Sequence, residues 1–88
     1  MCTYNTESLD LNGSAKGATG WFHATQATVY FDHPVHFGAG HALMVDVINP
    51  SRGASARVGL ELDSESAREL AHAILRTLDS VPEGLVEH

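Results

Sequence analysis

The sequence predicts an α+β fold, a four-stranded antiparallel β-meander with one C-terminal helix packed on one face. Apolar and polar residues alternate with a period of two in several short runs before residue 63. The connections between these runs are short, which favours antiparallel neighbours. From Ser64 the period becomes helical. We expect residues 1–81 to form a single domain and residues 82–88 to form a C-terminal tail.

The first two strands are predicted on either side of a glycine-containing segment. Residues 3–11 carry apolar side chains among polar ones and are typical of an edge strand. Residues 12–20 contain three glycines and small side chains, so we expect a loop there. Residues 21–32 alternate and predict the second strand. Closing this hairpin through the loop should pair residues whose numbers add up to about 32 to 34.

The next two strands are predicted at residues 41–48 and 56–62. Asn49, Pro50 and Gly53 between them form a dense turn signal, because proline restricts φ, glycine permits positive φ and asparagine bonds to its own backbone. The inward set is Leu43, Val45, Val47, Val58, Leu60 and Leu62. The outward set includes Met44, Asp46, Arg57, Gly59 and Glu61.

A helix is predicted from Ser64, with Asp63 or Ser64 as its N-cap. Its apolar stripe comprises Ala67, Leu70, Ala71, Ile74 and Leu78. The helix should end by Ser80, because Pro82 and Gly84 do not continue it.

Composition excludes several classes of function. The formal charge is −6 and only five lysines and arginines are present, scattered along the chain, which argues against a nucleic-acid surface. No apolar run approaches the ~18 residues of a membrane helix. The N-terminal residues lack the pattern of a secretory signal, and the single cysteine agrees with a reducing compartment. We therefore expect a cytoplasmic protein without nucleic-acid or membrane partners.

The chemistry-bearing residues concentrate between the second and third predicted strands. The segment Asp32-His33-Pro34-Val35-His36-Phe37-Gly38-Ala39-Gly40-His41 holds three of the six histidines. The predicted register places Cys2 near Tyr30 to Asp32, at the same end of the sheet. The fourth strand also ends there, which brings the helix N-terminus, with its positive dipole end, to this site.

The leading hypothesis is a small metal-binding protein. His33, His36 and His41 would hold a divalent transition metal, with Cys2 or Asp32 as the remaining ligand or as the catalytic base. Imidazole, carboxylate and thiolate donors suit zinc, iron or copper. Such a centre could perform metal-assisted acid–base chemistry on a small polar molecule. Whether the protein is an enzyme stays open.

Other interpretations of the same residues stay open. The histidines could be exposed loop residues, or Cys2 and His33 could form a nucleophile–base pair oriented by Asp32. The main alternative is a metal-free oligomeric module that binds a ligand or a partner, with the histidine segment as its lid. A phosphate site at Gly13 to Gly20 is disfavoured, because the P-loop spacing is absent.

A homodimer or higher homo-oligomer is also predicted, because a domain of this size gains core by association. One helix cannot cover both faces of a four-stranded sheet. We expect the outer face, with Tyr30, Met44 and Ile48, to form the contact.

Four strings of residues resemble a family of small stand-alone bacterial proteins of unassigned function, a domain of unknown function. They are residues 1–4, residues 30–36, residues 41–43 and the strand–helix junction at residues 58–67. The resemblance covers roughly residues 1–80. It implies a small independent protein, with specialised metabolism as a setting for some members, and it implies no catalytic residues.

Overall fold

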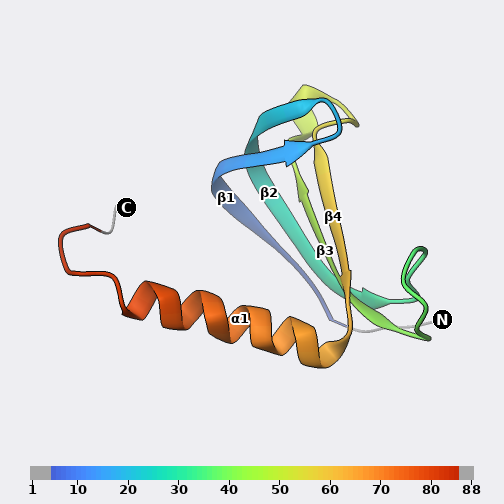
Figure 1. Cartoon of the computed structure of the whole chain (residues 1–88). Helices are drawn as coiled ribbons and strands as arrows, with labels where there is room; N and C mark the ends of the chain where they lie inside the picture. Colours follow the sequence, from blue (N-terminus) through green and yellow to red (C-terminus); the bar gives the residue numbers. More distant parts are fainter. Residues whose placement is uncertain (1–4, 86–88) are drawn as a thin grey trace.

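The computed structural model describes residues 5–85, and it confirms the α+β fold class (Figure 1). The four strands form one antiparallel sheet in the order β1-β2-β3-β4, followed by a single helix. The elements are β1 (Thr6–Gly17), β2 (Gly20–Asp32), β3 (Ala42–Ile48), the 3-10 turn η1 (Pro50–Arg52), β4 (Arg57–Leu62) and α1 (Ser64–Asp79). In the described part of the chain, no helix is long and apolar enough to cross a membrane.

The strand register sorts side chains onto two faces as the alternation predicts. Val29 lies opposite Val45, and Val45 lies opposite Leu60, so these three share one face of the sheet. Tyr30, Met44 and Glu61 pair in the same way and share the other face. We call the first the helix-facing face and the second the outer face. Paired residues in antiparallel strands point to the same side, so the division holds for β3, β4 and the part of β2 that pairs with β3, from Gln26 to Asp32.

The prediction of a loop over residues 12–20 is wrong. Residues 12–17 continue β1, and only Ala18 and Thr19 lie between β1 and β2. Thr6 therefore lies opposite Tyr30 and Gly17 opposite Gly20, so paired numbers add up to 36 or 37 rather than 32 to 34. The register shifts between Asp10 and Gly13, where an irregularity absorbs the extra residue. The glycines weaken strand propensity, but pairing with β2 outweighs that local preference.

The main core lies at the end of the sheet that is farthest from the helix. There the β1–β2 hairpin curls over the sheet, and β1 approaches β4 (Figure 1). Phe22, Ala24 and Ala56 are buried at this end, against Leu11, Ala15, Val47 and Val58. Gly17 permits the curl, since a Cβ there would lie 3.2 Å from Phe22 and 3.2 Å from the carbonyl oxygen of Ser55.

The turn before β4 is anchored by the buried Asn49. Its side chain donates a hydrogen bond to the carbonyl oxygen of His23 (2.8 Å) and accepts one from the backbone N–H of Ser51 (3.1 Å). The turn therefore closes onto β2 and fixes the start of β4. His23 itself lies at this end of the sheet, opposite Ser14, and is therefore far from the histidine segment at the other end.

Helix α1 begins at the predicted cap and lies on one side of the sheet, yet it contacts the sheet sparsely. Asp63 is the N-cap, and its carboxylate accepts a 2.6 Å hydrogen bond from the backbone N–H of Ser66. The helix then diverges from the strands (Figure 1), and its contacts with the sheet are mainly with β3. No α1 residue is buried. The predicted apolar stripe exists, but the sheet of the same chain leaves most of it uncovered.

Candidate functional site

The histidine loop (residues 33–41) connects β2 to β3 at the end of the sheet where the helix begins. The last pair of the β2–β3 ladder is Asp32 with Ala42, so the loop starts directly at this end of the sheet. The Asp32 carboxylate accepts a 2.7 Å hydrogen bond from the backbone N–H of His33. Asp32 thus orders the entry to the loop. This contact gives Asp32 a structural role and does not test the predicted catalytic one.

Two of the three predicted metal ligands lie together. The ring centroids of His33 and His41 are 4.3 Å apart, and the His41 ring stacks on Phe31 at 5.6 Å. His33 Nδ1 lies 2.8 Å from the carbonyl oxygen of Gly40. Because a carbonyl oxygen only accepts, this bond places the proton on Nδ1, and in the neutral ring Nε2 carries the lone pair.

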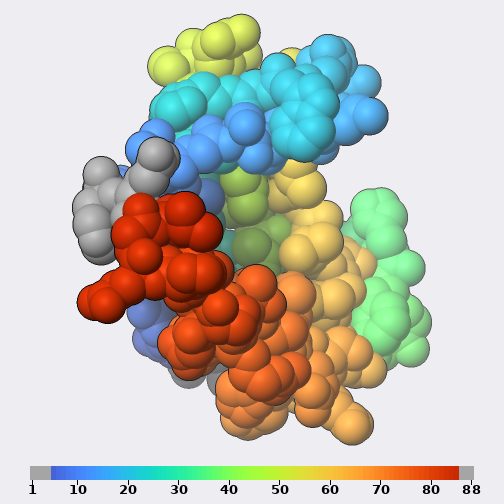
Figure 2. Space-filling model, turned by 60° about the vertical axis from the view of Figure 1, so that its left-hand side comes forward, coloured from blue at the N-terminus to red at the C-terminus, as the bar shows by residue number. Residues whose placement is uncertain are grey.

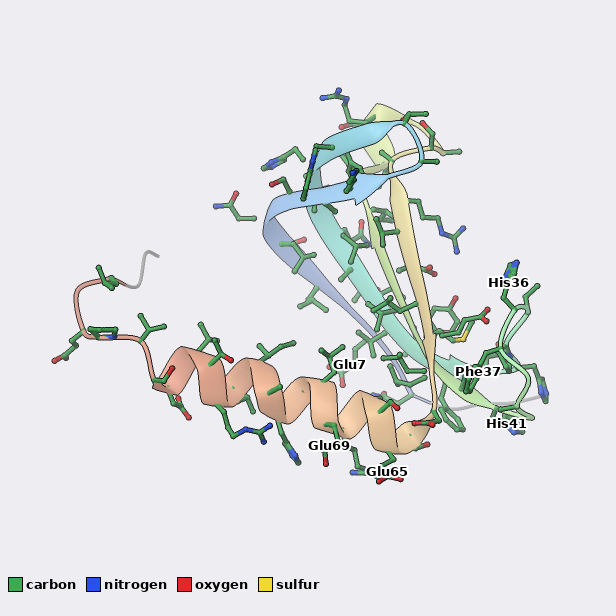
Figure 3. The ribbon with its side chains drawn as sticks, in the orientation of Figure 1. Glu7, His36, Phe37, His41, Glu65 and Glu69 are labelled. Atoms are coloured by element: carbon green, nitrogen blue, oxygen red, sulfur yellow. The ribbon has the colours of Figure 1, made fainter. Side chains whose placement is uncertain are left out.

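His36 is separated from this pair. Its side chain is 83% exposed, and it lies at the tip of the loop, away from His41 (Figure 3). Among residues 5–85, no group of three or more histidine, cysteine, aspartate or glutamate side chains is arranged to hold a metal ion. Cys2, the other predicted ligand or nucleophile, lies outside the described residues.

The loop is attached to the outer face of the sheet through Glu61 on β4. The Glu61 carboxylate accepts hydrogen bonds from the backbone N–H groups of Val35 (2.9 Å) and His36 (2.8 Å). These two bonds hold the pKa of Glu61 below its ordinary value of 4.5. A single carboxylate therefore holds the tip of the loop over the sheet.

A hollow of about 600 Å³ lies between the loop and the outer face. Phe37 lies on the side of the loop that faces the strands (Figure 3), and it is 40% exposed. Met44 lies on the sheet below and is 8% exposed. The hollow is lined by Tyr30, Val35, His36, Phe37, Met44, Asp46, Arg57, Gly59, Leu60 and Glu61. Met44 is therefore part of this site and not the centre of an exposed apolar patch.

A polar network forms one wall of the hollow. The Tyr30 hydroxyl donates to Asp46 Oδ2 (3.0 Å), and Arg57 Nη2 donates to Asp46 Oδ1 (3.0 Å). Burial raises the pKa of the Tyr30 phenol above its ordinary 10.0, and the hydrogen bond to Asp46 adds to this effect. The Tyr30 hydroxyl donates a hydrogen bond to Asp46 and keeps lone pairs that can accept another one.

These polar residues were not among the predicted site residues. The alternation in β3 and β4 predicts Asp46, Arg57 and Glu61 on the outer face, beside the apolar residues for which the sequence predicts a subunit contact. The site is recognisable only because the histidine loop folds over these three side chains. The hydrogen bonds from the backbone N–H groups of Val35 and His36 to Glu61 set this loop conformation. Nothing in the loop sequence specifies a partner on β4.

Comparison with known proteins identifies a family. A model of a family described as "Family of unknown function (DUF6295)" matches residues 1–87. No curated protein and no solved structure matches the chain. This result agrees with the resemblance to a domain of unknown function, and it carries no activity, ligand or residue role. The chain belongs to the family of unknown function DUF6295.

Proposed function

We propose that this protein is a small-molecule-binding module whose site is the hollow between the histidine loop and the outer face of the sheet. The observation that carries the proposal is the attachment of the loop to Glu61, which holds Phe37 and Val35 above the sheet beside a polar network. A site of this kind combines apolar walls with a few oriented polar groups, as ligand sites usually do.

The charges of the lining define the class of ligand. Asp46 is neutralised by Arg57 at 3.0 Å, whereas the Glu61 carboxylate is paired with uncharged backbone N–H groups and with the exposed His36 at 4.0 Å. The hollow therefore carries excess negative charge when His36 is neutral. Met44, Val35 and Phe37 supply apolar surface. The ligand is a small molecule with an apolar ring or chain and a cationic or hydrogen-bond-donating group.

Three matched probes test this proposal: benzylamine, benzyl alcohol and benzoate. Each is titrated at millimolar concentration into ¹⁵N-labelled protein, and the amide chemical shifts are followed. We expect shifts at Tyr30, Met44 and Glu61 that are largest with benzylamine and smallest with benzoate. Tyr30→Phe should weaken binding, and Trp21→Phe, at a site 69% exposed and outside the hollow, should leave it unchanged.

Two outcomes overturn the proposal. One is that none of the three probes shifts the amides of the outer face. The other is that the shifts fall on the helix-facing face instead. Repeating the titration with a chelator present separates this module from a metal-dependent one, because the proposed site uses only protein groups. A chelator that abolished probe binding would contradict it.

Metal binding is the second candidate function, and the proximity of His33 and His41 favours it. Two imidazoles are fewer than the three protein ligands of a typical catalytic zinc site, so a metal would need further ligands. Elemental analysis of protein purified without an affinity tag tests this candidate. Less than about 0.1 metal per chain would overturn it, and so would metal retention that does not fall as histidines become protonated.

A cytoplasmic location and self-association stay predictions from the sequence. The contact surface predicted for association lies on the outer face, where the histidine loop folds over Met44. Exposed apolar side chains such as Leu9 on the helix-facing side support a contact there instead.

A further inference from the structure

The apolar stripe of α1 faces the sheet without reaching it. Glu65 and Glu69 lie on the side of the helix away from the sheet (Figure 3). At 100° per residue, the stripe lies on the opposite side of the helix from these two glutamates. Within the stripe, Leu70 is 44% exposed, Ile74 is 53% exposed and Leu78 is 54% exposed. An amphipathic stripe of this width is stable in water when another apolar surface covers it.

The helix-facing face of the sheet is uncovered in the same region. Leu9 is 46% exposed and Leu60 is 40% exposed. Val29, Phe31, Leu43, Val45 and Leu62 on the same face are only partly buried. A second hollow of about 390 Å³ lies here, lined by Asn5, Glu7, Val29, Tyr30, Phe31 and Leu43. The sheet and the helix thus present two apolar surfaces to the space between them, and Figure 2 shows how open that side is.

The junction between β4 and α1 opposes closure within one chain. A single residue, Asp63, separates the two elements, and its backbone is extended with φ −69° and ψ 164°. Its carboxylate is committed to the cap, and this bond lowers the pKa of Asp63 below its ordinary value. Turning the helix onto its own sheet would change the backbone of Asp63 and break the cap.

The chain exposes more surface than a compact monomer of its size. The accessible surface is 6758 Å², whereas a compact monomer of 9.4 kDa exposes about 5,000 Å². The radius of gyration is 14.6 Å, whereas about 12 Å is expected for this length. If about a third of this excess area is assigned to the chain ends, roughly 1,200 Å² per chain is left. Doubled over two chains, that area matches the interface of a stable dimer.

We infer that a second copy of this chain occupies the open space, in a symmetric dimer in which the helix of each copy covers the helix-facing face of the other. A two-fold axis makes the interface self-complementary, because the stripe of one chain meets the sheet of its partner and the reverse contact follows. One association then covers both exposed surfaces. The outer-face hollow lies on the other side of the sheet, so this inference is independent of the proposed function.

Mass measurement by sedimentation or light scattering tests the inference on the full chain at about 100 µM, a concentration well above the dissociation constants typical of such interfaces. We expect twice the 9.4 kDa of one chain. Ile74→Asp in the stripe and Leu9→Asp on the helix-facing face, outside both hollows, should each give the single-chain mass with the circular dichroism of the folded protein. His72→Asp, exposed on the polar side of the same helix, is the control and should stay dimeric.

Methyl contacts between chains test the exchange of helices. In a mixed sample, NOEs filtered for one labelled and one unlabelled chain should connect Ile74 with Val45 or Leu60. If both aspartate variants unfold, dilution of the wild-type protein decides the question, because a dimer dissociates on dilution. A wild-type monomer at 100 µM overturns the inference, whether it is extended or closed on its own helix. A dimer that survives Ile74→Asp overturns it as well.

Discussion

Glu61 is the residue on which the position of the histidine loop depends. In the strand ladder Glu61 pairs with Met44, which is outside the loop. Its carboxylate nevertheless accepts hydrogen bonds from the backbone N–H groups of both Val35 and His36. A carboxylate that accepts two backbone bonds is a stronger acceptor than a neutral group. Loop geometry therefore depends on a side chain 25 residues or more away in the sequence.

Glu61→Ala should release the loop while leaving the sheet intact. The backbone N–H groups of Val35 and His36 lose their acceptor and become exposed to water. We expect their amide hydrogen exchange to accelerate several-fold, with unchanged exchange in β2 and β3. Glu65→Ala, on the far side of the helix, is the matched control and should leave loop exchange unchanged. Identical exchange in Glu61→Ala and the wild type would contradict this role.

The loop should also detach in acid. The pKa of Glu61 is lower in the folded protein than its ordinary 4.5, so the ionised carboxylate stabilises the attached loop above that value. This stabilisation is lost as the pH falls from 4.5 through the lowered pKa of the folded state. The amide shifts of Val35 and His36 should report the transition. In Glu61→Gln the same shifts should show no transition in this pH range.

At the scale of elements, the long β1–β2 hairpin positions the main core. Its glycines have different roles. A Cβ at Gly17 would lie within 3.3 Å of Phe22 and of the backbone carbonyls of Ser55 and Arg57, whereas a Cβ at Gly13 would meet nothing within 4 Å. Gly17 therefore permits the close approach of the hairpin to β4, and Gly13 lies beside the register shift in open space.

Gly17→Ala should destabilise the protein, and Gly13→Ala should not. The added methyl at residue 17 forces the hairpin away from β4, which costs about 1–3 kcal/mol as overpacking usually does. At residue 13 the methyl meets open space, so the free energy of unfolding should change by less than about 0.5 kcal/mol. Urea unfolding of both variants at one protein concentration measures the difference. Equal losses in the two variants would show that hairpin curvature does not depend on Gly17.

At the scale of the whole molecule, the two ends differ in how well they are packed. The end with Phe22, Ala24 and Ala56 is closed by the curled hairpin, whereas the end that carries α1 is open. A chain that buries so little apolar surface has little to offset its conformational entropy. The dimer inferred above would supply the missing burial.

Thermal stability should therefore depend on protein concentration. If folding and association are coupled, the midpoint of unfolding rises as the concentration of the chain increases, by mass action. Scans over about a hundredfold range of concentration should show an upward shift of several degrees. Ile74→Asp should abolish the dependence. A midpoint that is constant over this range would mean that the folded state is a stable monomer.

Much of the fold follows from local patterns. The alternation around Val45 and Leu60 assigned the two faces, the cluster at Asn49 marked the turn before β4, and Asp63 marked the start of the helix. Each of these features depends on backbone chemistry within a few residues. The same patterns could not predict the length of β1, because residues 12–17 become a strand only through pairing with β2.

The sequence predicted the location of the candidate site but not the arrangement of its side chains. The sequence placed the histidine loop at the end of the sheet where the helix begins, and His33 with His41 do lie together there. It could not show that His36 lies apart, since the conformation of a loop depends on the groups it meets.

The sequence by itself determined the fold class, the two faces of the sheet and the amphipathic character of α1, because periodicity and capping are local properties of the chain. Only the tertiary structure decided that Glu61 holds the loop over Met44 and that the stripe of α1 diverges from its own sheet. Both depend on contacts between residues distant in sequence. Their geometry is set by packing and by the direction in which Asp63 starts the helix.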